Sequence, residues 1–252
     1  REEALGDYLL RHSATSSDAK YDSSATILPA KDVVLHVYDD DYPSVVMSKS
    51  DVGVTEGGAT DTYTVVLSSQ PSAGVSVGVV VANGGGVVQA TVSPTSVSFT
   101  RFNWHIPQTV TVTATNDDID DGDFSVAITQ TASSDDSDYA DGTVRYLPAQ
   151  TVTCAVYDDD HAVVALTASD IAVVEGGSSQ SWDVVLASEP TSSVTVAVAV
   201  VGNASQVLLD KASVTFSTGN WDTAQTITVT AQHDHREEAL GDYLLRHSAT
   251  SS

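Results

Sequence analysis

Apolar and polar residues alternate over short stretches along most of this chain, a pattern that predicts β-strands rather than helices. In residues 43–161 we expect about seven strands, because apolar side chains recur at every second position with turn residues between the stretches. Seven short alternating strands indicate an antiparallel sandwich of immunoglobulin-like type, so the fold class is all-β. The positions that define one face of each predicted strand are Val45; Tyr63, Val65 and Leu67; Val75, Val77, Val79 and Val81; Val97 and Phe99; Val110, Val112 and Ala114; Phe124, Val126 and Ile128; and Val152, Cys154 and Val156.

The chain begins and ends with the same seventeen residues, REEALGDYLLRHSATSS, at 1–17 and 236–252. Arg1 recurs as Arg236, so the period is 235 residues. Within that period lies a second, looser repeat, since VVEGGSSQSWDVVLASEP at 173–190 is similar to VTEGGATDTYTVVLSSQP at 54–71. Such self-similarity at fixed spacing is the sequence signature of a repeat architecture. A duplication introduced by cloning is the alternative explanation of the identical ends.

The order of the repeated motifs predicts three segments. Residues 43–161 form a complete module, A, and residues 162–252 form the N-terminal part of a module B. Residues 1–42 form the C-terminal part of a preceding B, so the sequence has the phase of a tandem array. Residues 18–41 and 162–235 are then expected to find partner strands in neighbouring copies, or between chains by strand donation. Linkers of two or three residues predict a stiff rod of tandem sandwiches.

The charge is strongly negative, with 34 acidic against 10 basic residues and a formal net charge of −24. Nucleic acid and anionic membranes are poor partners for such a surface, and no apolar run is long enough for membrane insertion. The acidity points to divalent cations, with solubility of an extracellular protein or a high-salt setting as the alternative. A single cysteine, Cys154, excludes an internal disulfide framework, and its place on an apolar face predicts a buried thiol.

Acidic residues recur at three places in module A. Glu56 lies in the motif TEGG, the run NDDIDDGD spans 116–123, and YDDD ends the last predicted strand. The strand register puts Asp158 and Asp160 just past the core, where the loop and the glutamate can join them. Crowded carboxylates repel one another, and hard oxygen ligands favour Ca²⁺ over Mg²⁺. Ordinary solvated turn aspartates are the alternative.

The combination TEGG, SFTRFNWHIPQTVTVTATNDDIDDGD and YDDD resembles the Calx-β domain of sodium–calcium exchangers, integrin β4 and large tandem-repeat surface proteins. The resemblance covers module A and, in permuted order, module B. It implies a seven-strand β-sandwich that binds Ca²⁺ at one end. The metal ligands that it implies in module A are Glu56, Asp117, Asp118, Asp121, Asp158, Asp159 and Asp160.

Module B departs from this pattern, because His235 stands at the position of Asp118 and Arg236 follows it. We therefore expect fewer ions or weaker binding there. A transition-metal site on His233 and His235 would need a third ligand, which the spacing does not supply. The ligands implied for module B are Glu175 and Asp234, with Asp39, Asp40 and Asp41 from an adjacent copy.

Motifs for catalysis, such as a nucleophile elbow, a P-loop or HExxH, do not occur, so an enzyme is not expected. Asn203 begins an Asn-Ala-Ser glycosylation sequon. The leading hypothesis is a repeat unit of a long extracellular or cell-surface fibre, stiffened by Ca²⁺ and contacting further copies of itself. The alternative is an adhesin whose modules bind carbohydrate or a partner protein.

Overall fold

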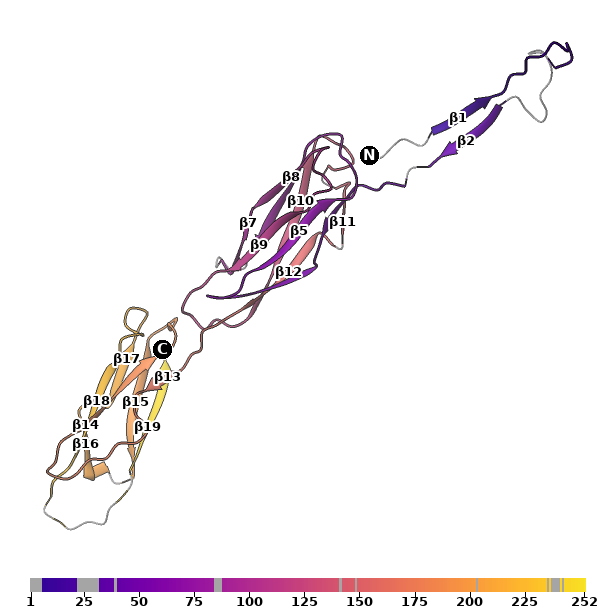
Figure 1. Ribbon diagram of the computed structural model, residues 1–252. Helices are drawn as coiled ribbons and strands as arrows, with labels where there is room; N and C mark the ends of the chain where they lie inside the picture. The colour runs from indigo at the N-terminus through magenta and orange to yellow at the C-terminus, as the bar shows by residue number, and fades with distance from the viewer. Residues whose placement is uncertain are drawn as a thin grey trace. The chain divides into compact units, whose positions relative to one another are not determined.

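The computed structural model shows an all-β protein, with one 3-10 turn at Ala204–Gln206 and no α-helix among the residues that it describes (Figure 1). No helix in this part of the chain has the length and apolar character needed to cross a membrane. The described residues are 6–21, 32–38, 40–83, 88–140, 142–147, 149–202, 204–234, 236, 241 and 243–252. The contacts divide the chain into a first unit of Arg1–Val54, Thr60–Thr113 and Ser125–Ala155, and a second unit of Thr55–Ala59, Ala114–Phe124 and Val156–Ser252.

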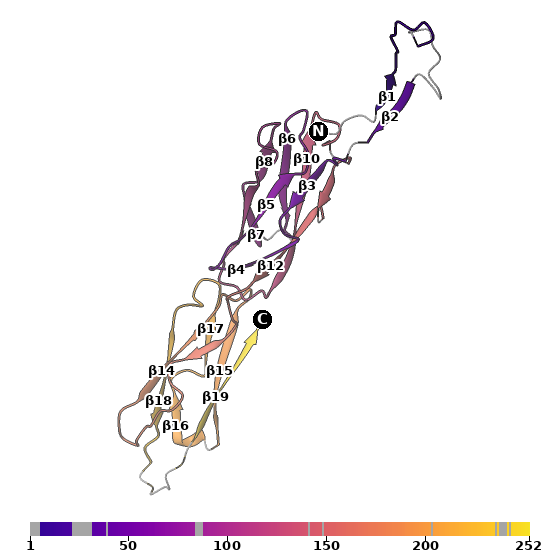
Figure 2. The ribbon, with the colours of Figure 1, turned by 45° about the vertical axis from the view of Figure 1, so that its right-hand side comes forward.

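The first sandwich consists of two five-stranded sheets, in the orders β4-β12-β10-β6-β8 and β11-β3-β5-β9-β7 (Figure 2). All seven predicted strands are present, and three further short strands, β4, β7 and β11, join them. The pairs with a defined register are antiparallel except β11 with β3, which is parallel. The strands are β3 (Ser44–Met47), β4 (Asp51–Thr55), β5 (Asp61–Leu67), β6 (Val75–Ala82), β7 (Ala90–Ser93), β8 (Ser96–Phe99), β9 (Gln108–Ala114), β10 (Phe124–Ser134), β11 (Arg145–Leu147) and β12 (Thr151–Tyr157).

The alternating residues of these strands fill the core between the sheets. On β12, Val152 and Cys154 are fully buried and Val156 nearly so, which confirms the predicted inward face and the buried thiol. Burial raises the pKa of Cys154, so the sulfur stays protonated and packs as a small apolar group. Tyr63 lies in the same core, where its hydroxyl accepts a hydrogen bond from Gln130 Nε2 at 2.9 Å.

The second sandwich has a four-stranded sheet, β13-β14-β18-β16, and a three-stranded sheet, β17-β15-β19. Trp182 takes the core position of Tyr63, and its Nε1 donates to His247 Nε2 at 3.0 Å. Trp221 packs against the same core. The strands are β13 (Val164–Leu166), β14 (Gln180–Leu186), β15 (Val194–Val201), β16 (Val207–Leu209), β17 (Ser213–Phe216), β18 (Gln225–Ala231) and β19 (Leu244–Ser251).

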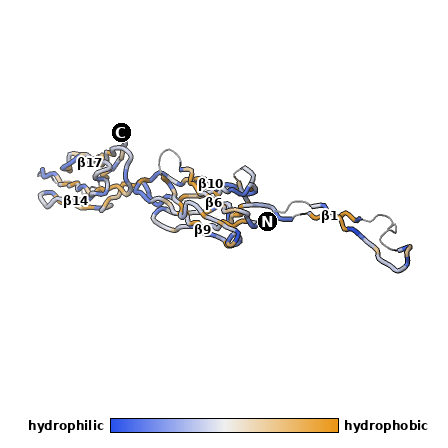
Figure 3. Tube along the Cα trace, turned by 90° about the horizontal axis from the view of Figure 1, so that it is seen from above, coloured by the Kyte–Doolittle hydropathy of each residue, from blue (hydrophilic) through white to orange (hydrophobic). Residues whose placement is uncertain are grey.

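A separate two-stranded sheet is formed by β1 (Gly6–Arg11) and β2 (Asp32–Val37). The pairing is antiparallel, from Gly6 opposite Val37 to Arg11 opposite Asp32. Large apolar side chains are exposed on both strands, and Figure 3 shows hydrophobic residues along this hairpin. This hairpin therefore exposes apolar surface that a complete sandwich would bury. A two-stranded ribbon of this kind is only marginally stable in water.

Candidate metal centre

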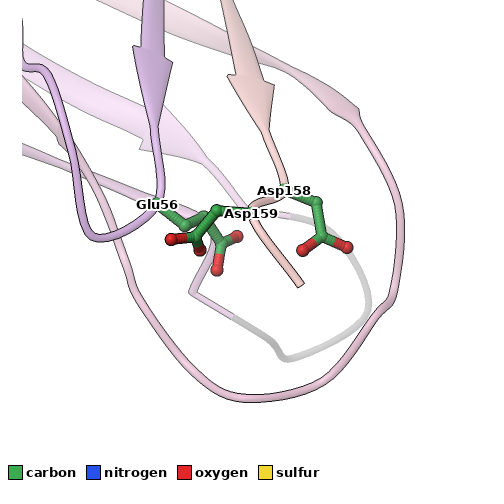
Figure 4. Close-up of side chains that lie close together, drawn as sticks. All are labelled: Glu56, Asp158 and Asp159. Atoms are coloured by element: carbon green, nitrogen blue, oxygen red, sulfur yellow. The ribbon is translucent and has the colours of Figure 1, made fainter. Parts of the chain in front are cut away.

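Three carboxylates gather where two neighbouring strands end. Glu56 follows β4, while Asp158 and Asp159 follow β12, and β4 lies beside β12 in one sheet. One oxygen from each of the three side chains lies within 4.8 Å of the others (Figure 4). The sequence analysis expected Glu56 to join the aspartates just past the last strand, and the structure adds the strand β4, which ends beside β12. The structure brings them into one cluster, hereafter the acidic cluster.

The turn after β4 depends on glycine. Gly57 has a φ of +58°, in the left-handed region that glycine adopts at low cost. A Cβ at this position would lie 2.5 Å from Asn116 Oδ1 and 3.0 Å from Asp159 Oδ2. The backbone N–H of Glu56 donates to the carbonyl of Tyr157 at 3.0 Å, which extends the pairing of the two strands to the cluster. Glycine at position 57 therefore lets the backbone of the Glu-Gly-Gly motif lie close to the side chains of Asn116 and Asp159.

The loop between β9 and β10 closes around these carboxylates with backbone N–H groups. Asp117 N–H donates to Glu56 Oε2 at 3.4 Å, and Gly122 N–H donates to Asp158 Oδ2 at 2.6 Å. In return, Asp158 N–H donates to Asp123 Oδ1 at 3.1 Å. These bonds satisfy some of the carboxylate oxygens, and they hold the loop against the ends of β4 and β12.

The ionised form of the Glu56 carboxyl is disfavoured in the cluster. The residue is only 2% exposed, and this burial is the main cause that raises the pKa of its carboxyl. The negative charges of Asp117, Asp121 and Asp158 raise that pKa further, against the lowering effect of the Asp117 N–H. Asp158 differs, because N–H donors outweigh the effect of burial and lower its pKa. A cation among these groups would remove the repulsion that Glu56 experiences.

Asp160 is the second carboxyl whose ionised form is disfavoured. Burial is the first cause that raises its pKa, followed by the charges of Asp159, Asp158, Asp118 and Asp117. Its Oδ2 is buried and has no hydrogen-bond partner within the part of the chain that the structure describes. A buried, unpartnered carboxylate oxygen is costly unless a proton or a cation compensates it.

The seven ligands expected in module A thus lie in one region of the second unit. Three of them form the acidic cluster, two more, Asp117 and Asp121, act electrostatically on Glu56, and Asp117 and Asp118 act on Asp160. The sequence reasoning left out Asp120 and Asp123, although the same acidic run contains them. Asp123 accepts from Asp158 N–H, and Asp120 Oδ2 accepts from Ala162 N–H at 2.7 Å.

The loop also contacts the start of the second sandwich, inside the second unit. Glu189 N–H donates to the carbonyl of Asp118 at 2.6 Å, next to the bond between Asp120 and Ala162. Ile119 and Asp120 line a cavity of about 370 Å³ together with Val163 and other residues of the second sandwich. The segment that carries the candidate ligands is therefore anchored to the strands that follow it.

The ligands expected in module B do not form a comparable cluster among the described residues. Glu175 Oε2 lies 3.8 Å from His233 Nδ1, and Asp234 Oδ1 accepts from Arg236 N–H at 3.0 Å. Asp40 and Asp41 follow β2 in the first unit. Three residues with predicted roles lie outside the described residues, namely Asp39, Asn203 and His235.

No family model matches the chain, and no curated protein matches it either. Among solved structures, similarity extends to CBD12 of CALX1.2 at 15% identity, covering 74% of this chain and 75% of that chain with a TM-score of 0.37. The calcium binding domain CBD12 of CALX1.1 gives 15% identity, 75% and 76% coverage and a TM-score of 0.39. The E. coli chaperone DraB gives 9% identity, 77% and 89% coverage and a TM-score of 0.33.

Proposed function

We propose that the acidic cluster binds Ca²⁺. The observation that carries this proposal is the approach of three carboxylates to within 4.8 Å, with Glu56 almost fully buried. Ca²⁺ takes six to eight oxygen ligands in flexible geometry, and Glu56, Asp117, Asp121 and Asp158–Asp160 offer a set of that kind. Mg²⁺ demands a strict octahedron and keeps several waters, which suits a crowded set of carboxylates less well.

The proposed role of the ion is mechanical. The loop that supplies Asp117 and Asp121 is hydrogen-bonded to Ala162 and Glu189 of the second sandwich. A cation that fixes this loop to Glu56 and Asp158 would limit the motion of the short connection from β12 to β13. We infer that the chain is a repeat unit of an extracellular or cell-surface fibre, in which bound Ca²⁺ stiffens each joint.

Calorimetric titration of the full chain with Ca²⁺ tests the binding step, with Mg²⁺ titrated in parallel. We expect saturable Ca²⁺ binding that is tighter than Mg²⁺ binding, and its loss in the double variant Asp158→Asn, Asp159→Asn. The exposed Asp135 provides a control, since Asp135→Asn removes the same type of charge outside the cluster. Equal weak heats for both metals in all variants would refute the proposal.

Small-angle scattering of the same chain tests the mechanical role. Chelation of Ca²⁺ should broaden the distribution of distances and lower the melting temperature. An unchanged scattering profile in chelator, alongside confirmed Ca²⁺ binding, would separate the two steps and reject the stiffening role alone.

A further inference from the structure

Among the described residues the second sandwich has seven strands against ten in the first, and β12 is one of the three strands without a counterpart strand. In the first sandwich β12 lies between β4 and β10. The counterpart of β10 is β19, because Val75 pairs with Ser134 on β10 in the same way that Val194 pairs with Ser251 on β19. The counterpart of β4 is the segment 170–174, which forms no strand. The part of 162–252 that the structure describes has no counterpart of β12 between these two segments.

A groove of about 160 Å³ is lined both by the start of segment 170–174 and by residues of β19. On the side of that segment, Ile171 and Val173 are only partly buried, although Val52 and Val54 at the matching positions of β4 are buried. Six residues that line the groove are Ala168, Ile171, Trp182, Tyr243, Leu245 and His247.

The strand that matches this groove is β2. The segment ILPAKDVVLHVYDDD at 27–41 is similar to YLPAQTVTCAVYDDD at 146–160, so β2 is the counterpart of β12. Val33, Leu35 and Val37 are 50%, 45% and 47% exposed in the hairpin. Their counterparts in the complete sandwich are at most 1% exposed, namely Val152, Cys154 and Val156. Hence β2 exposes the face that a sandwich buries.

The hairpin shows that β2 pairs with the sequence of β19. Gly6–Arg11 has the same sequence as residues 241–246, since the two stand one period of 235 residues apart. Arg11 lies opposite Asp32, and its Nε is 3.4 Å from Asp32 Oδ1. In the same register on β19, Arg246 would face Asp32.

We propose that β2 of a second copy of this chain inserts into the groove beside β19. The inserted strand pairs antiparallel with β19 and turns Val33, Leu35 and Val37 toward the core of the second sandwich. Extended segments add to open sheet edges through main-chain hydrogen bonds, with alternate side chains giving specificity. Each copy has a donor in its N-terminal hairpin and an acceptor in its second sandwich, so copies join head to tail.

The insertion also brings acids to the second sandwich. Asp40 and Asp41 follow β2 as Asp159 and Asp160 follow β12. They would approach Glu175 and Asp234, so the module B cation site would be completed by the partner copy. This insertion rests on the part of the proposed function in which copies of the chain contact one another, and it identifies that contact. The strand pairing itself requires no cation, and its test is therefore made in chelator.

Sedimentation velocity over a range of concentrations in EDTA measures the assembly. We expect oligomers of the wild-type chain that grow with concentration, and monomers of Leu35→Asp, because Leu35 would face the groove once β2 is inserted. The matched control is Val34→Asp, whose counterpart Thr153 is exposed, and this variant should still assemble. Since β2 lies outside both sandwiches, near-UV circular dichroism should be unchanged in both variants. A monomeric wild type, or equal assembly of Leu35→Asp, would overturn the proposal.

Cross-linking tests the register. Leu9 pairs with Val34 in the hairpin, and Leu244 is one period after Leu9. The double variant Val34→Cys, Leu244→Cys should give a ladder of disulfide-linked oligomers on non-reducing gels. The pair Val34→Cys, Leu208→Cys places the second thiol on the exposed face of β16 and should give none. Ladders of equal strength from both pairs would reject the register. Ca²⁺ binding by the monomeric Leu35→Asp variant reports on the first site independently.

Discussion

Replacing Glu56 by glutamine should have opposite effects with and without Ca²⁺. The side chain keeps its shape and its ability to accept the hydrogen bond from Asp117 N–H, but it loses its charge. At 4.8 Å, the limit that encloses the three carboxylates, two unit charges repel by about 1 kcal/mol in water and about 3.5 kcal/mol at an effective dielectric constant of about 20. Because Asp158 and Asp159 contact solvent, we use about 1 kcal/mol for each pair.

Glu56 faces two such neighbours, so Glu56→Gln should stabilise the cation-free chain by about 2 kcal/mol. That increment corresponds to a rise of about 4–8 °C in the melting temperature of a chain of this length. In Ca²⁺ at about 100 times the wild-type Kd, the wild type should gain about 2.7 kcal/mol. A tenfold loss of affinity in the variant reduces that gain to about 1.4 kcal/mol.

Differential scanning calorimetry in EDTA and in Ca²⁺ measures both effects on one sample. The expected signature is a higher melting temperature of Glu56→Gln in EDTA together with a smaller Ca²⁺ increment, while Asp135→Asn changes neither. A variant that melts lower than the wild type in EDTA would refute the electrostatic reasoning. An undiminished Ca²⁺ increment would show that Glu56 is not a ligand.

Three further substitutions test other parts of the structure. Replacement of the fully buried Ile128 by alanine should cost about 2–5 kcal/mol in the free energy of unfolding, measured by denaturant titration. Gly57→Ala should lower the melting temperature and the Ca²⁺ affinity more than Gly122→Ala does, measured in paired melts and titrations. Both glycines have a positive φ, but only at Gly57 would the added Cβ lie as close as 2.5 Å to a neighbouring atom. Burial lowers the pKa of His247 below its ordinary 6.5, so the unfolded chain takes up this proton first as the pH falls. The free energy of unfolding of the second sandwich should therefore decline below about pH 6.5, until the pH passes the pKa of folded His247. The variant His247→Gln places the residue found at the matching position of the first sandwich, Gln130. Thermal melts at stepped pH should show a flatter decline for this variant.

Much of the sandwich could be predicted from sequence because its strands bury one face and expose the other. Every second residue of Val75–Val79 is buried, so the pattern reports the burial directly. The strand β11 has only three residues and offers no repeated inward position, while β4 contains Gly53, a residue that is rare in strands, so neither was predicted although the four-residue β8 was. The parallel pairing of β11 with β3 depends on how the chain returns from the 135–144 turn, which no local pattern encodes.

The candidate site was predicted in composition but not in detail. The strand register indicated that Asp158 and Asp160 lie just past the core, where Glu56 could join them. The strand β4, which brings Glu56 to the end of β12, was not predicted. Which acids bind backbone N–H groups and which remain without partners depends on the conformation of the 116–123 loop. The bond from Ala162 N–H to Asp120 was not predicted, because it depends on the same loop conformation.

The β1–β2 hairpin has a kinetic consequence for the proposed assembly. β2 is already paired with β1 over six residue pairs, and β1 has the sequence of the strand that β2 would join in another molecule. In each free molecule β1 thus competes for β2 with β19 of another molecule, and the two pairings form equivalent main-chain hydrogen bonds. Elongation becomes an exchange between equivalent partners, driven by the apolar side chains that the groove covers. Because a two-stranded ribbon is only marginally stable, the hairpin would release β2 readily, and the exchange would not wait for its opening.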